Sequence, residues 1–155
     1  ATVGMLFHNN KKEWHEWQPQ VLPGYTNPVI SSYEWVKKNG LTDILHFAPD
    51  LIGLINETKR MEIGTHTYSH YYCNETGQTI DHFKHDLDIS IKLAAAQKIE
   101  LKSLVFPRNQ FNEAYLSVCR EMGIEVVRSN PSCWYWNESR KETMVSKIAR
   151  TGDAY

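Results

Sequence analysis

Short apolar runs alternate along this chain with longer segments that carry their apolar residues on one helical face. Each run has the length of a buried strand, and polar or turn-forming residues separate it from the next segment. We predict strands at 1–7, 61–64, 103–106 and 124–127. We predict helices at 50–55, 81–97 and 112–122. This alternation is typical of parallel β/α units, so we expect an α/β fold, either a barrel or a doubly wound sheet.

The stretch 9–27 lacks this regular pattern. Prolines and a glycine interrupt any helical period there, which predicts a long loop or an irregular insertion. The loop contains Trp14 and Trp17. These side chains either fix the loop to its own domain or stack on sugar rings, and both interpretations stay open.

Neither end of the sequence resembles the end of a domain. Residue 1 is an alanine that already lies within the predicted strand 1–7, and residues 149–155 contain no closing element. We therefore interpret residues 1–155 as a single domain that is truncated at both ends.

The composition is that of an ordinary folded domain, with 41% hydrophobic and 23% charged residues. The 17 basic and 18 acidic side chains give a net charge of −1, which argues against a nucleic-acid partner. No apolar run approaches the length of a membrane span. Cys73, Cys119 and Cys133 have no metal-site spacing, and we interpret them as reduced thiols. The compartment and the oligomeric state stay open.

Two histidines, His66 and His70, follow the predicted strand 61–64 almost directly. Their spacing places both rings on one side of a helical turn, close enough to bind one metal ion. The spacing alone is weak, but the carboxyl end of a strand is where α/β folds bind ligands. The alternative is a pair of surface or capping histidines. His82 and His85, three residues apart, we interpret as polar-face residues of the helix 81–97.

A second candidate segment follows the predicted strand 103–106. Pro107 ends that strand, because proline cannot donate to the ladder. Arg108 is then placed at the carboxyl edge of the sheet, where its guanidinium can hold a carboxylate through two hydrogen bonds. The alternative is an ordinary ion pair between Arg108 and a surface acid.

The segment 62–70 reads Glu-Ile-Gly-Thr-His-Thr-Tyr-Ser-His. It resembles the second signature of the polysaccharide deacetylases, the NodB-homology enzymes of carbohydrate esterase family four, in which His-Ser/Thr-x-x-His follows a strand with Glu-Ile-Gly. The order of elements over 49–127 also resembles that family. The resemblance implies a distorted (β/α) barrel, of which this chain is a part, with 1–7 as its second strand. The sequence Phe-Pro-Arg-Asn-Gln at 106–110 resembles a divergent bacterial branch associated with surface polysaccharides.

The resemblance also implies roles for individual residues. His66 and His70 would be ligands of a divalent metal, zinc in the first place, with cobalt, nickel or manganese as alternatives. Thr67 would hydrogen-bond within the loop and hold the second histidine in place. Pro107 would line the sugar site, and Arg108 would orient a catalytic aspartate. The order Pro-Arg departs here from the arginine-before-proline order that is usual in the family.

Three further parts of the family pattern are not found in this sequence. The adjacent aspartates, which serve as the base and the third ligand, would precede residue 1, and the histidine that acts as general acid would follow residue 155. The aspartate–tryptophan pair of the fourth signature is replaced at 133–136 by Cys-Trp-Tyr-Trp. We therefore expect no deacetylase activity from this chain on its own.

The function we expect is that of a metal-dependent hydrolase that removes N-acetyl or O-acetyl groups from a glycan. One alternative is a non-catalytic carbohydrate-binding or metal-bound protein that kept the fold and lost the catalytic groups. Another alternative is an unrelated α/β domain in which the two histidines arose by chance, and it predicts no stoichiometric zinc. The partner in the first two cases is an acetylated polysaccharide or another glycan.

Overall fold

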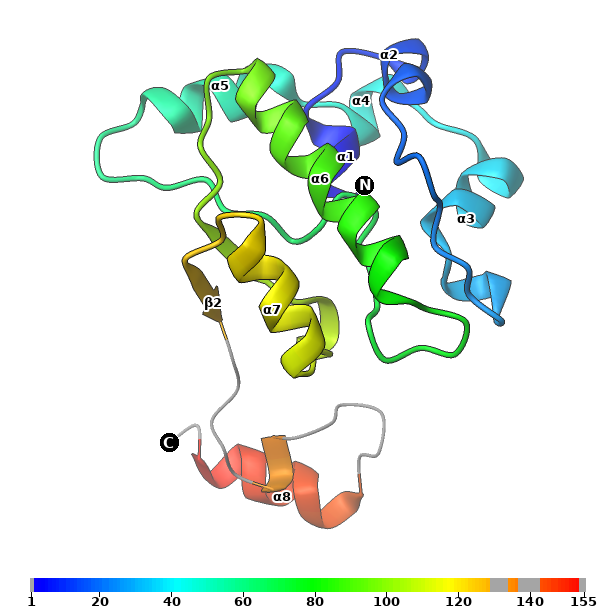
Figure 1. The fold of residues 1–155 in the computed structure, drawn as a ribbon, viewed down its shortest axis with the longest axis vertical. Coiled ribbons are helices and arrows are strands. Elements are labelled where there is room, and N and C mark those ends of the chain that lie inside the picture. Colours follow the sequence, from blue (N-terminus) through cyan, green and yellow to red (C-terminus); the bar gives the residue numbers. More distant parts are fainter. Residues whose placement is uncertain (1, 129–133, 137–142, 154–155) are drawn as a thin grey trace.

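The computed structural model describes residues 2–128, 134–136 and 143–153 (Figure 1). These residues form a mixed α/β structure that is mostly helical, with a small parallel sheet. The α-helices are α1 (Val3–Leu6), α2 (Lys11–Glu16), α3 (Ser32–Asn39), α4 (Asp43–His46), α5 (Pro49–Glu57), α6 (Ile80–Ala96), α7 (Glu113–Glu121) and α8 (Met144–Asp153). The other elements are the strands β1 (Ser103–Val105) and β2 (Val126–Arg128) and the 3-10 turns η1 (Pro28–Ile30), η2 (Pro107–Asn109) and η3 (Trp134–Trp136).

The sheet contains one β/α unit of the predicted kind. β1 and β2 are parallel, with Leu104 opposite Val127, and α7 lies between them in the chain. Asn112 caps the start of α7 by accepting hydrogen bonds from two backbone N–H groups. Gly123 follows the helix with a φ of 85°, a conformation that glycine adopts without strain. The prediction of parallel strands joined by a helix is therefore confirmed for 103–128.

The described residues do not form a barrel, because two of the predicted strands are absent. The segment 61–64 forms no strand and joins no ladder, and Thr65 after it makes a single bridge to β1. Its N–H donates to the carbonyl of Ser103 at 2.9 Å, and its carbonyl accepts from Val105 at 2.9 Å. Gly64 comes so close to the backbone of β1 that a Cβ there would lie 3.1 Å from the carbonyl oxygen of Ser103. A closed ladder of strands, which a barrel requires, is therefore not present among these residues.

The first residues are helical instead of extended. In α1 the N–H groups of Met5 and Leu6 bond to the carbonyl of Thr2, so the segment satisfies its backbone locally. Met5 and Phe7 are buried in the core nonetheless. A short apolar run does not by itself distinguish a strand from a helix, and here no neighbouring strand offers a ladder. The predicted strand at 1–7 is therefore wrong.

The stretch 9–27 also differs in part from the prediction, since α2 lies within it. Asn10 accepts hydrogen bonds from two N–H groups at the start of α2 and so caps it. Trp14 is buried and stacks on Tyr33, with ring centres 5.9 Å apart. Trp14 therefore fixes this stretch to its own domain.

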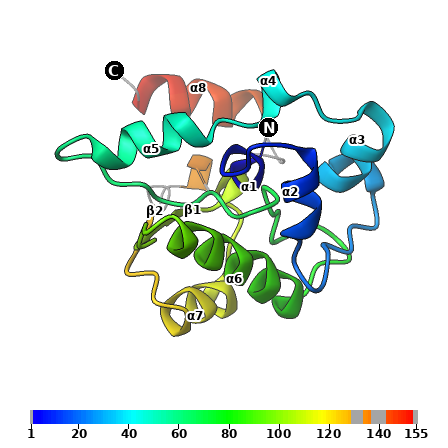
Figure 2. The same cartoon turned by 90° about the horizontal axis from the view of Figure 1, so that it is seen from above.

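α6 runs along the core and positions the candidate site. Thr79 caps it, because its side chain accepts a hydrogen bond from the N–H of His82. Its inner face buries Phe83 and Leu87 completely. Figure 2 shows α6 and α7 together on one side of the two strands, with α5 on the other side.

Among the described residues, no helix combines the length and the apolar character that crossing a bilayer requires. Cys73 and Cys119 are buried free thiols, and Cys133 lies outside the described residues.

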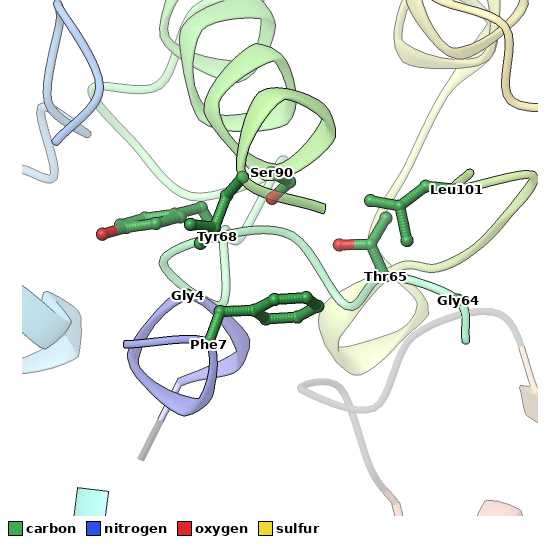
Figure 3. Close-up of a pocket in the computed structure, with 8 residues that line it drawn as sticks. Gly4, Phe7, Gly64, Thr65, Tyr68, Ser90 and Leu101 are labelled. Carbon is green, nitrogen blue, oxygen red and sulfur yellow. The ribbon is translucent and has the colours of Figure 1, made fainter. Parts of the chain in front are cut away.

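A small internal cavity lies between α1, α6 and the chain that leads to His66 (Figure 3). Thr65 and Ser90 border it, and neither hydroxyl has a hydrogen-bond partner in the described part of the chain. Its other lining residues, such as Phe7 and Tyr68, are mostly apolar. The cavity is too small to hold a sugar ring.

Candidate metal centre

The two candidate ligands, His66 and His70, lie next to each other. Their ring centres are 4.7 Å apart, and the rings are inclined by 64°. The segment that carries them is a loop and not the predicted helical turn. Thr67 and His70 have positive φ angles of 64° and 61°, which fold the chain back and bring the second ring beside the first. The two histidine rings are therefore brought together by a folded loop and not by a helical turn.

One hydrogen bond fixes the orientation of His66. Its Nδ1 lies 2.7 Å from the carbonyl oxygen of Val105, at the end of β1. A carbonyl only accepts, so Nδ1 carries a proton, and in the neutral ring the lone pair is on Nε2. This bond between a ring N–H and a backbone carbonyl is the usual support of a metal-binding histidine. His66 also borders an open hollow beside β1, together with Gly64 and Ser103.

His70 is held in its neutral form. Burial lowers the pKa of its imidazole to about 4, and the charges of His66 and Arg108 act in the same direction. A neutral imidazole is the form that binds a metal ion. The ring of Tyr72 meets the His70 ring edge-on, with centres 5.0 Å apart and an angle of 86°. At neutral pH His70 therefore offers an unprotonated nitrogen.

Thr67 closes the loop between the two ligands. Its buried hydroxyl donates to the carbonyl of His66 at 2.6 Å and accepts from the N–H of Tyr71 at 2.7 Å. These two bonds tie the residue at the start of the loop to the residue after His70. Thr67 thus makes contacts of the kind that the resemblance implies for it.

Asp86 supports the same loop from α6, and sequence reasoning missed it. Its carboxylate accepts from the N–H of Tyr68 at 2.8 Å, from the N–H of Ser69 at 3.1 Å and from the Ser69 hydroxyl. The side chain is fully buried. Burial raises the pKa of Asp86 to about 6, although the hydrogen bonds from Ser69 and Tyr68 lower it. The available signal was its place on the apolar face of α6, between Phe83 and Leu87.

Arg108 is part of η2 and lies near the two imidazoles. Its guanidinium carbon is 4.4 Å from the centre of the Tyr72 ring, a cation–π contact. Arg108 and Asn109 both have positive φ, 54° and 53°, a conformation that costs about 1–3 kcal/mol for a residue other than glycine. Pro107 is fully buried in the described structure, and its assignment to the wall of a sugar site stays a prediction.

The donor set fits a divalent metal ion of the zinc type. Two neutral imidazoles are ligands that suit zinc, cobalt and nickel, and the fixed tautomer of His66 presents one nitrogen outward. Within residues 2–128, 134–136 and 143–153, no third histidine, cysteine or carboxylate joins them in one cluster. The described residues could therefore supply two ligands, and a bound ion would take its others from water or from other groups.

No protein-family model, no curated protein and no solved structure matches this chain. The likeness to the polysaccharide deacetylases therefore depends on the residues of the loop 62–70 and of the segment 106–110.

The two histidines on α6, His82 and His85, do not add ligands to this site. His85 lies on α6, with its Nε2 3.8 Å from a carboxylate oxygen of Asp81. His82 is half-buried beside Gly24, where a Cβ on the glycine would come within 2.8 Å of the imidazole ring. Neither residue belongs to a metal-binding cluster within the described ranges.

Proposed function

We propose that this chain carries the metal-binding part of a hydrolase that removes acetyl groups from a glycan. The observation that carries the proposal is the pair of adjacent imidazoles, with the His66 ring oriented by its hydrogen bond to Val105. The proposal includes the fold: β1, α7, β2 and the segment 61–65 before His66 are part of a distorted (β/α) barrel of the deacetylase type.

The residues of the loop bind and orient in this proposal. His66 and His70 donate nitrogen lone pairs to one divalent cation, and Thr67 and Asp86 hold the loop in the required shape. The cation, when bound, supplies Lewis acidity that polarises an acetyl carbonyl and lowers the pKa of water. Arg108 adds a positive charge at the edge of the same site. We assign the removal of the proton from water to no residue of the described chain.

A non-catalytic protein that binds a metal or a glycan is the second candidate. It is favoured by one observation, that no third side-chain ligand joins the two imidazoles in the part of the chain that the structure describes. Such a protein would bind zinc and an acetylated glycan without releasing acetate. The two candidates therefore share the metal site and differ in turnover.

The test is acetate release by the complete gene product that carries this chain, loaded with zinc, from N-acetylated chitotetraose and from O-acetylated xylan. We expect His66→Ala and His70→Ala to abolish release from whichever substrate is hydrolysed, and His85→Ala to leave it unchanged. Unchanged turnover in the first two variants would refute the proposed hydrolase. Zinc and glycan binding without acetate release from either substrate would favour the second candidate.

A further inference from the structure

We propose that Arg108 and Tyr72 form a carboxylate-binding subsite beside the His66–His70 pair, and that the glycan is acidic. This inference rests on the proposed function and names its substrate class, an acetylated glycan that contains uronic acid residues. It replaces the role that the resemblance implies for Arg108, the orientation of a catalytic aspartate, because the order Pro-Arg at 107–108 departs from the family pattern. It starts from a side chain for which the described structure provides no charged partner.

Arg108 is exposed and free to bind an anion. In the ranges that the structure describes, no carboxylate lies within ion-pair distance of its guanidinium. Its contact is instead with the face of the Tyr72 ring. An arginine that serves only solubility would be free to turn into solvent, whereas this one stacks on an aromatic ring. The stack leaves the N–H edges of the guanidinium plane available for hydrogen bonds.

The position of Arg108 links it to the metal centre. Its guanidinium carbon lies 4.4 Å from the Tyr72 ring centre, and the same ring meets that of His70 at 5.0 Å. The guanidinium, the phenol ring and the imidazole thus form one continuous row of contacts. A carboxylate bound by Arg108 would belong to a group adjacent to the one bound at the imidazoles.

The loop that carries Arg108 is fixed in place. The side chain of Gln110 donates to the carboxylate of Glu75 at 3.0 Å and accepts from the N–H of Asn74 at 3.3 Å. Gln110 and Glu75 are both buried. These bonds hold η2 against the loop that follows His70, so the positive φ of Arg108 is maintained by its surroundings. The backbone that carries Arg108 therefore needs no reordering when the side chain binds a ligand.

The chemistry favours a carboxylate. A single planar guanidinium matches a planar, singly charged carboxylate through two parallel hydrogen bonds. Uronic acid residues place such a carboxylate on a sugar ring. A neutral acetylated glycan would leave this charge without a partner, so the subsite discriminates between acidic and neutral chains. The carboxylate of free acetate has the same chemistry, and the experiment separates the two sources.

The test is calorimetric binding of two matched tetrasaccharides to the full chain in the presence of zinc. One probe alternates N-acetylglucosamine with glucuronic acid, and the other is the same molecule with its carboxyl groups reduced to alcohols. We expect the acidic probe to bind about ten-fold more tightly, with a preference that weakens as salt is added. Arg108→Gln should abolish the preference, Arg108→Lys should keep part of it, and the matched control Arg120→Gln should keep all of it.

Three results would overturn the proposal: equal affinity of the wild type for both probes, an unchanged preference in Arg108→Gln, or binding of neither probe. The proposal would also be overturned if sodium acetate displaced the acidic probe and bound as tightly as that probe. The subsite would then recognise free acetate and no glycan. Zinc binding is measured separately in the same samples. Arg108 is not a proposed ligand, so zinc uptake in Arg108→Gln should persist. Failure of the subsite with zinc uptake intact refutes this inference alone, whereas loss of zinc uptake in the wild type refutes the proposed function.

Discussion

Replacing Asp86 with asparagine removes a buried carboxylate that accepts three hydrogen bonds from the loop between the two imidazoles. The pKa of Asp86 rises from 3.8 to about 6 on folding, because burial outweighs the hydrogen bonds. The folded chain therefore binds this proton more tightly than the unfolded chain. Its contribution to stability is fully present below pH 3.8 and is lost as the pH rises through about 6.

The size of the effect follows from the shift in pKa. A rise from 3.8 to about 6 corresponds to about 3 kcal/mol. Asparagine does not titrate, so the free energy of unfolding of the wild type, minus that of Asp86→Asn, should fall by about 2 kcal/mol between pH 4 and pH 7. The rest of the difference is already lost at pH 4, where the aspartate of the unfolded chain is largely ionised. Comparing the two proteins cancels the contributions of other titrating groups, such as His8 and His70, whose pKa values are lowered by burial.

The assay is urea unfolding of both metal-free proteins at several pH values, with tryptophan fluorescence as the signal that monitors unfolding. Asp88→Asn is the matched control, because Asp88 lies on the same helix, is more exposed and pairs with Lys92 at 2.6 Å. Its difference from the wild type should vary by less than about 0.5 kcal/mol over the same range. A difference for Asp86→Asn that grows with pH would refute the reasoning, because the hydrogen bonds would then outweigh burial.

Three further predictions concern the same loop. Thr67→Val should lower the free energy of unfolding by about 1–3 kcal/mol in urea titrations, because the buried N–H of Tyr71 loses its acceptor; unchanged stability would contradict this. By NMR titration, the pKa of the His70 ring should be about 4. Arg108→Gln should raise this pKa, because it removes a nearby positive charge. A higher pKa in the wild type, or no rise in the variant, would be inconsistent with the site. The isolated chain should release no acetate above a metal-free control, and turnover would mean that its residues include the catalytic base.

The helices with one apolar face could be predicted from the sequence. The segments 81–97 and 112–122 correspond to α6 and α7 with boundaries that differ by a residue or so. Their periodicity and their caps are local features, and neither depends on distant parts of the chain. β1 was also predictable, because a short apolar run between polar segments is typical of a buried strand.

The parts that failed depend on partners distant in the chain. Whether 1–7 becomes a strand is decided by the presence of a neighbouring ladder, which the sequence of that segment does not contain. Asp86 shares the apolar face of α6 with Phe83 and Leu87, but its hydrogen bonds to the loop follow only from the tertiary structure. The proximity of His66 and His70 was predicted, whereas the positive φ angles that produce it were not.

Zinc stoichiometry tests the metal site most directly. Each protein is incubated with excess zinc at pH 7.5, passed through a desalting column and measured by elemental analysis. We expect one zinc ion per chain in the wild type and in the control His85→Ala, and none in His66→Ala or His70→Ala. Equal zinc content in all four proteins, or none in the wild type, would contradict the assignment of the two imidazoles as ligands.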